Sequence, residues 1–341
     1  MKKSIPVDQA VGMVLPHDIT EIVKDKFKGC AFKKGHIIRS EDIEHLRRLG
    51  KEHIYVLELT EDEIHENEAA RLLVAALAGE GTEYEDNVVE GKVAVTAACD
   101  GLLKINKQVL FDFNMLGDVM CATLHTNTPV KKGEQIAACR LIPLIGTRTV
   151  VTEAVNIAAA GEAVLRVVPL RQTKVGLVIT GSEVYYGRIK DKFEDVLRQK
   201  LADFGSEVAM VAFAPDDPDR IAAEISQCIA QGAEIIVTSG GMSVDPDDVT
   251  RTGIHLAGAV DTVYGTPVLP GAMFLTGRIG NVPVLGVPAC GMFHKITVLD
   301  LILPRILTGE TIGRAEFADM GHGGLCRNCK HCQYPVCNFG K

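Results

Sequence analysis

Residues 173 to 310 alternate between apolar strand patterns and amphipathic helix patterns, and this alternation restricts the fold more than any other feature of the chain. The strands are predicted at 175–180, 207–214, 233–238 and 282–287, and the helices at 191–204, 219–231 and 292–307. Strands and helices in alternation predict a parallel sheet that helices cover on both faces, with right-handed crossovers. The sequence therefore predicts a three-layer α/β domain.

Ligands of such sheets bind outside the carboxyl ends of the strands, where the loops 181–188 and 239–250 are expected. The second loop reads S-G-G-M-S-V-D-P-D-D-V-T, and its backbone amides, bare of side chains at the glycines, can face a phosphate. Asp245, Asp247 and Asp248 follow, and carboxylates beside a phosphate typically hold Mg²⁺ or handle a proton. The alternative is an ordinary α/β connection, in which Gly supplies the turn and Asp and Thr cap the next helix.

The rest of the chain shows other patterns. A helix with an N-cap at Ser40 is predicted at 40–49, a strand at 53–59 and a helix at 61–79, followed by β-branched runs at 92–97, 102–105, 135–139 and 149–151. We therefore predict an N-terminal α+β module (1–60), a helix and linker (61–91), a β-rich domain (92–172), the α/β domain (173–312) and a Cys-rich tail (313–341).

Composition restricts the function classes. With 341 residues, 47% hydrophobic and 23% charged, the chain is expected to form several globular domains. A formal net charge of -8 argues against nucleic-acid binding, which favours a basic surface. Met1-Lys2-Lys3 is followed by polar residues rather than an apolar targeting segment, and the apolar stretches are too short to span a membrane. We expect a cytoplasmic protein with no membrane segment.

Five short motifs in the α/β region carry a family resemblance. They are V-I-T-G-S-E-V at 178–184, G-R-I-K-D at 187–191, T-S-G-G-M-S-V at 238–244, P-G-A-M at 270–273 and G-V-P at 286–288. In this order they resemble the molybdopterin-binding domain of molybdenum cofactor biosynthesis proteins. The chain looks most like the molybdopterin molybdenumtransferase branch, because its first 60 residues are similar in pattern and A-A-C-D-G-L at 97–102 stands where that branch has an Asp-Gly motif.

The resemblance implies a function and a set of site residues. The implied activity is to bind molybdopterin, in adenylated form, and to promote molybdate insertion with Mg²⁺, in a homo-oligomer such as a homodimer. Asp191, Asp248 and Asp100 match acidic positions of the catalytic site, and Asp245 and Asp247 are candidate metal ligands. The residues that match the loops holding the pterin and its phosphate are Thr180, Gly181, Ser182, Glu183, Ser239, Gly240, Gly241, Ser243 and Pro288.

Three departures from the family pattern leave the activity open. Phe193 stands where the family has Asn, Pro288-Ala289-Cys290-Gly291 where it has Gly-Asn-Pro, and Asp245 where it has a second Gly. These changes alter the hydrogen-bonding groups of the pocket. An enzyme therefore competes with a non-catalytic molybdopterin carrier or sensor that serves a molybdoenzyme. A third hypothesis is an unrelated sugar-phosphate or nucleotide binder with the same type of sheet.

The last sixteen residues hold four of the ten cysteines. Cys326, Cys329, Cys332 and Cys337 have the spacing C-x2-C-x2-C-x4-C, which predicts a Zn²⁺ site or a [4Fe-4S] cluster. His322 and His331 are candidate substitute ligands. The alternative is a disordered tail of free thiols. The other six cysteines are scattered through apolar or mixed surroundings and are expected to be small buried hydrophobes in a reducing compartment.

Overall fold

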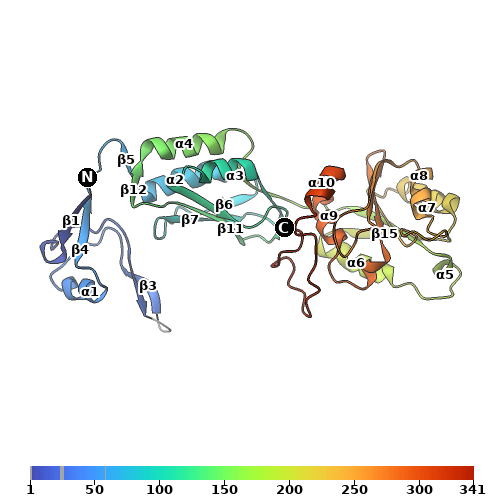
Figure 1. The fold of residues 1–341 in the computed structure, drawn as a ribbon, viewed down its shortest axis with the longest axis horizontal. Helices are drawn as coiled ribbons and strands as arrows, with labels where there is room; N and C mark the ends of the chain where they lie inside the picture. Colours follow the sequence, from blue (N-terminus) through green and yellow to red (C-terminus); the bar gives the residue numbers. More distant parts are fainter. Residues whose placement is uncertain (1, 24–26, 58) are drawn as a thin grey trace. The chain divides into compact units, whose positions relative to one another are not determined.

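The computed structural model describes residues 2–23, 27–57 and 59–341, which form two compact units (Figure 1). Unit 1 comprises Met1–Ala98, Ile105–Leu124 and Gly133–Arg166, and unit 2 comprises Cys99–Lys104, His125–Lys132 and Val167–Lys341. Within the described residues, no helix has both the length and the apolar character needed to cross a membrane.

The first part of unit 1 folds around a small apolar core that includes Leu15, Ile38 and Leu46. Its elements are β1 (Lys2–Pro6), η1 (Val7–Gln9), β2 (Ile19–Val23), β3 (Phe27–Phe32), α1 (Asp42–Arg48) and β4 (His53–Leu57). β1 pairs antiparallel with β4, and β2 with β3. Helix α1 starts later than predicted, since Glu41 rather than Ser40 occupies the N-cap position.

The second part of unit 1 is a four-stranded antiparallel sheet with strand order β6-β7-β11-β9, packed against helices. Its elements are β5 (Glu63–His65), α2 (Glu66–Leu77), β6 (Thr82–Tyr84), β7 (Lys92–Ala97), α3 (Lys107–Asn114), β9 (Val119–Thr123), β11 (Gln135–Leu141), β12 (Ile145–Thr147) and α4 (Arg148–Ala159). A further small sheet has the order β10 (Pro129–Val130), β8 (Gly101–Ile105) and β13 (Leu165–Val168).

Two predictions in unit 1 were wrong. The β-branched run 149–151 lies in helix α4, because Thr147 accepts a hydrogen bond from the Val150 N–H as an N-cap and the buried residues that follow have helical spacing. The predicted helix 61–79 begins only at α2, because Glu63–His65 forms strand β5 against β12. In both places pairing and packing override local propensity.

Unit 2 is built on a six-stranded sheet with the order β15-β14-β16-β19-β18-β17. Its elements are β14 (Lys174–Thr180), α5 (Ser182–Tyr185), α6 (Phe193–Asp203), β15 (Glu207–Ala214), α7 (Pro218–Ala230), β16 (Ile235–Ser239), α8 (Thr250–Leu256), β17 (Val260–Tyr264), β18 (Leu275–Ile279), β19 (Val282–Val287), η2 (Ala289–Met292), α9 (Val298–Leu307) and α10 (Arg314–Asp319). β15, β14, β16 and β19 are parallel, as predicted. β18 and β17 are antiparallel, so the sheet is mixed.

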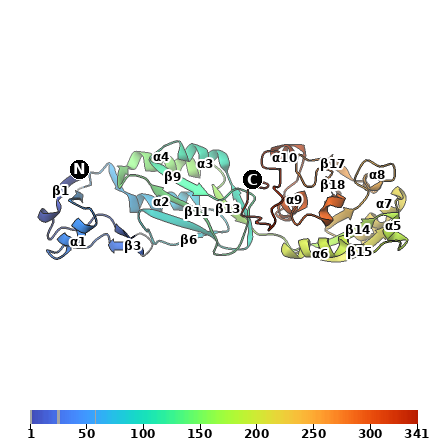
Figure 2. The same ribbon diagram turned by 60° about the horizontal axis from the view of Figure 1, so that its bottom comes forward.

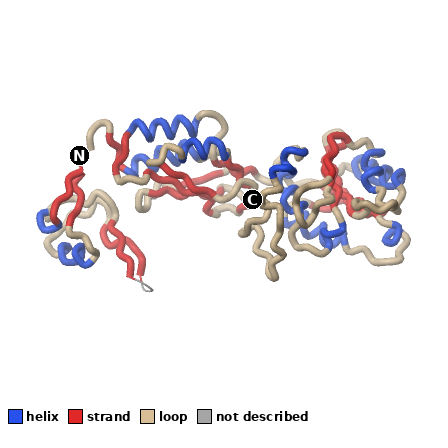
Figure 3. Tube along the Cα trace, in the orientation of Figure 1, coloured by secondary structure: helices blue, strands red, loops and turns tan. Residues whose placement is uncertain are grey.

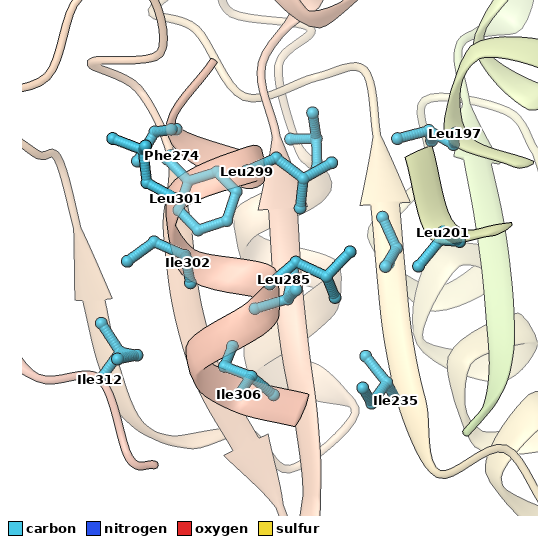
Figure 4. Packing of buried hydrophobic residues seen from close by; sticks show 14 of the residues in the cluster. Leu197, Leu201, Ile235, Phe274, Leu285, Leu299, Leu301, Ile302, Ile306 and Ile312 are labelled. Carbon is cyan, nitrogen blue, oxygen red and sulfur yellow. The ribbon is translucent and has the colours of Figure 1, made fainter. Parts of the chain in front are cut away.

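Helices cover both faces of this sheet, and α6 and α9 lie on the face opposite α7 and α8 (Figure 2). The larger apolar core joins α6 and α9 to the sheet through residues such as Leu201, Leu285 and Ile302 (Figure 4). The other core contains Ile221 and Ile225 of α7. The predicted three-layer arrangement is confirmed, because strands apolar on both faces must be buried by a layer on each side.

A buried ion pair fixes α6 to the start of α9. The Lys200 ammonium donates hydrogen bonds to both carboxylate oxygens of Asp300 at 2.7 Å and to the Lys295 carbonyl at 2.6 Å. Asp300 also accepts the Thr297 N–H at 2.7 Å, completing the capping box of α9. Both charges in this cluster are paired. Buried ions are tolerated only when they are paired and hydrogen-bonded.

We predict that Asp300→Ala lowers the free energy of unfolding by about 3–5 kcal/mol, because it leaves the Lys200 ammonium buried without its counter-ion. Asp203→Ala, an exposed acid near the end of α6, serves as the control and should change stability by less than about 0.5 kcal/mol. Urea unfolding followed by circular dichroism measures both. Equal effects of the two substitutions would contradict a structural role for the buried pair.

Candidate functional site

Three loops leave the carboxyl ends of the parallel strands β14, β16 and β19, the edge at which such sheets bind ligands. The first loop runs through 181–192, the second through 240–249 and the third through 288–297. They contain all of the residues that sequence analysis assigned to the pterin site except Asp100, Thr180 and Ser239. Thr180 is the last residue of β14, and Ser239 is the last residue of β16.

The hydroxyl group of Thr180 joins the first two loops. Its Oγ1 donates to the Ser239 carbonyl at 2.8 Å and lies 2.8 Å from Thr250 Oγ1. Because the single proton of Thr180 goes to the carbonyl, the Thr250 hydroxyl donates to Thr180. Thr180 and Thr250 are both buried. This chain of bonds holds the second loop at both of its ends.

The two glycines of the second loop are required by its conformation. Gly240 and Gly241 have φ values of +85° and +57°. A Cβ atom on Gly240 would lie 2.4 Å from the Thr180 carbonyl oxygen, and one on Gly241 would lie 2.3 Å from Thr250 Oγ1. Only glycine can adopt left-handed backbone angles and also let neighbouring atoms come so close, because it has no Cβ atom.

This turn leaves polar groups open to a ligand. Among the described residues, the N–H groups of 241–244 have no backbone acceptor within the protein. At the end of β16, the buried Ser239 hydroxyl has no hydrogen-bond partner among the residues that the structure describes. Successive amides in left-handed turns form an anion-binding concavity. The open amides of 241–244, which include that of Ser243, lie in the loop for which the phosphate cradle was predicted.

In the first loop, Gly181 has φ +138° and starts the short helix α5. The Ser182 N–H donates to Asp216 Oδ2 at 2.8 Å, and the Asp216 N–H donates to Ser182 Oγ at 3.1 Å. The Ser182 hydroxyl is thus used to join this loop to the loop after β15. Glu183 is exposed at the same edge.

The acidic candidates are placed differently from one another. Asp191 caps α6, since its Oδ1 accepts the Phe193 N–H at 3.0 Å and its Oδ2 accepts the Glu194 N–H at 2.8 Å. It also lines a hollow of about 520 Å³. Asp248 Oδ2 accepts the Asp245 N–H at 3.0 Å, which folds the acidic stretch into a turn.

Asp245 and Asp247 are exposed on this turn. Within the part of the chain that the structure describes, no three His, Cys, Asp or Glu side chains are gathered as a ready-made metal site. A Mg²⁺ ion needs less from the protein, because it keeps several waters and is held by one or two carboxylates plus substrate phosphates. The acids of the second loop fit that kind of binding.

Asp100 is not brought to these loops by any contact among the described residues. It lies exposed, with its carboxylate 2.8 Å from both the Lys131 ammonium and the Lys132 N–H. These two hydrogen bonds hold the pKa of Asp100 below its ordinary value. Asp100 therefore remains a candidate by resemblance alone.

The third loop contains the buried Pro288 and the 3-10 turn η2. The Gly291 N–H donates to the Pro288 carbonyl at 3.0 Å. Burial raises the pKa of the Cys290 thiol above its ordinary value, so this sulfur stays protonated near neutral pH. It is therefore a weak nucleophile.

Sequence analysis missed two groups that support the second loop. The Tyr264 hydroxyl donates to the Met242 carbonyl at 2.7 Å, and the Arg251 guanidinium lies 4.2 Å from the centre of the Tyr264 ring. Arg251 thus places a cation directly after the acidic turn. Arg251 lies close to the T-S-G-G motif in sequence, and this proximity could have indicated it. Tyr264 lies on strand β17, and no sequence motif indicates its role.

The matches to protein-family models agree with this geometry. Residues 176–308 match a model described as a probable molybdopterin binding domain, and residues 4–58 match one described only as a domain of unknown function. The α/β domain of unit 2 is therefore similar in sequence to molybdopterin-binding domains over residues 176–308. The match is to the domain family and does not single out the molybdopterin molybdenumtransferase branch.

Known proteins resemble parts of the chain. A CinA-like protein of Mycobacterium sp. (strain MCS) is 36% identical over 77 residues, and one of Mycobacterium tuberculosis (strain ATCC 25618 / H37Rv) is 38% identical over 77. Each match covers 23% of this chain and 18% of the relative, so the chain spans less than a fifth of these proteins. The molybdopterin biosynthesis enzyme MoaB of Thermus thermophilus is a structural neighbour with 22% sequence identity and a TM-score of 0.35. The match covers 41% of this chain and 98% of the neighbour. The molybdopterin biosynthesis Mog protein of Mycobacterium ulcerans has 16% identity, coverage of 40% and 98%, and a TM-score of 0.35.

We predict that Gly240→Ala destabilises the protein more than Gly258→Ala does. Gly258 also has positive φ, but nothing lies within 4 Å of its Cβ position, so its substitution costs only the backbone strain of about 1–2 kcal/mol. Gly240→Ala adds a clash with the Thr180 carbonyl, which should cost about 1–3 kcal/mol more. Urea unfolding of both variants measures the difference. Equal destabilisation would show that the loop is not held against β14.

Proposed function

We propose that the α/β domain of unit 2 binds molybdopterin, with the terminal phosphate on the amides of 241–244 and the pterin against the first and third loops. The observation that carries the proposal is the open amide cradle at the carboxyl edge of a sheet whose sequence matches the molybdopterin-binding family. An adenylated form of the ligand would extend along the same edge. Ser243 would add a hydroxyl donor to the phosphate.

The activity proposed for this site is the insertion of molybdate into bound, adenylated molybdopterin, assisted by Mg²⁺. Asp245, Asp247 and Asp248 would hold the ion, which when bound neutralises phosphate charge and orients it. The chain's own residues bind and orient the ligand: the cradle fixes the phosphate, and Asp248 holds the acidic turn in place through the Asp245 N–H.

A second candidate function is a non-catalytic carrier or sensor of molybdopterin that serves a molybdoenzyme. One observation favours it: both oxygens of Asp191 are occupied as the cap of α6, and Phe193 is buried in the core where the family has Asn. A carboxylate committed to a helix cap is less available for proton transfer. The homo-oligomeric state and the cytoplasmic location remain predictions.

The binding proposal is tested with purified protein, by acid extraction and fluorescence detection of pterin and by titration with molybdopterin. Ser243→Ala should weaken binding by about tenfold or more without changing stability, because a hydrogen bond to a charged phosphate contributes about 1.5–3 kcal/mol. Ser226→Ala, an exposed serine of α7, is the matched control and should bind normally. Protein that neither retains nor binds molybdopterin would refute the proposal.

Asp248→Asn separates the two candidate functions. The fold should be retained, because this loop carboxylate packs against little core. If the protein inserts molybdate, turnover should fall by about 10²–10³-fold with only a modest change in affinity, since the charge acts through Mg²⁺ or on the transition state. A molybdate insertion assay measures this, with Asp203→Asn as the control. Wild-type protein that binds pterin and inserts no molybdate would instead support the carrier.

A further inference from the structure

The four tail cysteines line one hollow of unit 2. This tail hollow has a volume of about 570 Å³, and its wall includes Cys326, Cys329, Cys332 and Cys337 together with residues 293–296. Cys329 and Cys332 are exposed, whereas Cys326 and Cys337 are half-buried against the larger core. Four thiols from one irregular segment therefore line the same hollow.

The tail is anchored although, in the described residues, it contains no helix or strand after α10 (Figure 3). The Cys326 N–H donates to the Leu269 carbonyl at 2.8 Å, and the Gly340 N–H donates to the Gly323 carbonyl at 3.0 Å. Phe339 is 4% exposed and belongs to the core of the α/β domain. The cysteines thus lie between two anchored parts of the tail. A disordered tail would not make these contacts.

The backbone between the first pair of cysteines makes a left-handed turn at Asn328. Asn328 has φ +48°, and this left-handed turn directs its N–H to Cys326 Sγ at 3.5 Å. The turn lies between Cys326 and Cys329, and this hydrogen bond holds it to the Cys326 side chain.

The charges around the hollow have one sign. Lys295, Arg327 and Lys330 line it, and among the described residues no Asp or Glu does. This is unusual in a chain with a formal net charge of -8. Cations lower the energy of nearby thiolates and offset the negative charge of a thiolate-bound metal.

We propose that Cys326, Cys329, Cys332 and Cys337 bind a metal centre in the tail hollow, either one Zn²⁺ ion or an iron–sulfur cluster. Binding replaces four S–H bonds by four sulfur–metal bonds and releases four protons. Four thiolates give either centre two negative charges in total, which the three cations compensate. This proposal is independent of molybdopterin binding.

Metal binding must draw the sulfur atoms inward, because the described side chains do not form a gathered group of metal ligands. Cys329 and Cys332 can move, since both side chains are exposed. The tail cannot simply be deleted as a test, because deletion would also remove Phe339 from the core. Single Cys→Ser substitutions keep the volume and remove only the ligand.

The test uses the full chain, purified without oxygen or chelator after growth with iron and zinc. We expect one centre per chain: iron with acid-labile sulfide and a broad visible absorption for a cluster, or zinc in a colourless protein. Cys329→Ser and Cys332→Ser should each lower metal occupancy more than about tenfold. Cys30→Ser, an exposed thiol in unit 1, is the matched control and should keep the metal.

Protein that contains neither metal and has four freely reacting tail thiols would overturn the proposal, as would metal that survives both substitutions. Circular dichroism of the variants checks that they remain folded. Molybdopterin titration of the same samples separates the two sites. Loss of metal with normal pterin binding places the centre in the tail, and full metal content without pterin binding refutes only the proposed function.

Discussion

The geometry of the candidate site depends on one hydroxyl group. Thr180 Oγ1 bonds the Ser239 carbonyl and the Thr250 hydroxyl, so the ends of two neighbouring strands and the start of α8 meet at a buried atom. Removing it would leave two buried polar groups unpaired, at a cost of about 1–3 kcal/mol for each. The loop with the open amides is thereby held in shape before any ligand arrives, which reduces the ordering cost of binding.

A second constraint connects the site loops to the tail. The Lys200–Asp300 pair fixes the chain just before α9, and the Lys200 ammonium also holds the Lys295 carbonyl. Residues 293–296 line the tail hollow and belong to the third site loop. The Tyr334 hydroxyl donates to the Asp300 carbonyl at 3.5 Å. The tail and the third site loop therefore both contact the first turn of α9. The region after β19 therefore serves both sites.

The sequence predicted the parallel part of the sheet well, because strands buried on both faces need long apolar runs and amphipathic helices between them. Strands 207–214 and 282–287 were placed at their observed bounds. It failed at 149–151, where β-branched residues lie in a helix whose cap, Thr147, and later buried residues, Ala154 and Ala158, lie outside the run. The antiparallel edge of the sheet was missed because its pairing is a long-range property.

For the site, sequence found the glycines whose φ and close contacts the structure now explains, since such glycines stand out in a motif. It could not find Asp216 or Tyr264, because both act through hydrogen bonds to a loop distant in sequence. The tail cysteines were evident from spacing. The cations around them became evident only when the hollow brought Lys295 beside Arg327 and Lys330.

Asp191 shows that a carboxylate used to cap a helix is less available for a reaction. Its carboxylate accepts two N–H groups at the start of α6, and a helix cap of this kind contributes about 1 kcal/mol. Both carboxylate oxygens of Asp191 are therefore committed to the backbone at the start of α6. Among the described residues, Asp248 accepts one such bond, from the Asp245 N–H to its Oδ2. If either acid takes part in a reaction, Asp248 is the one that the structure leaves free to do so.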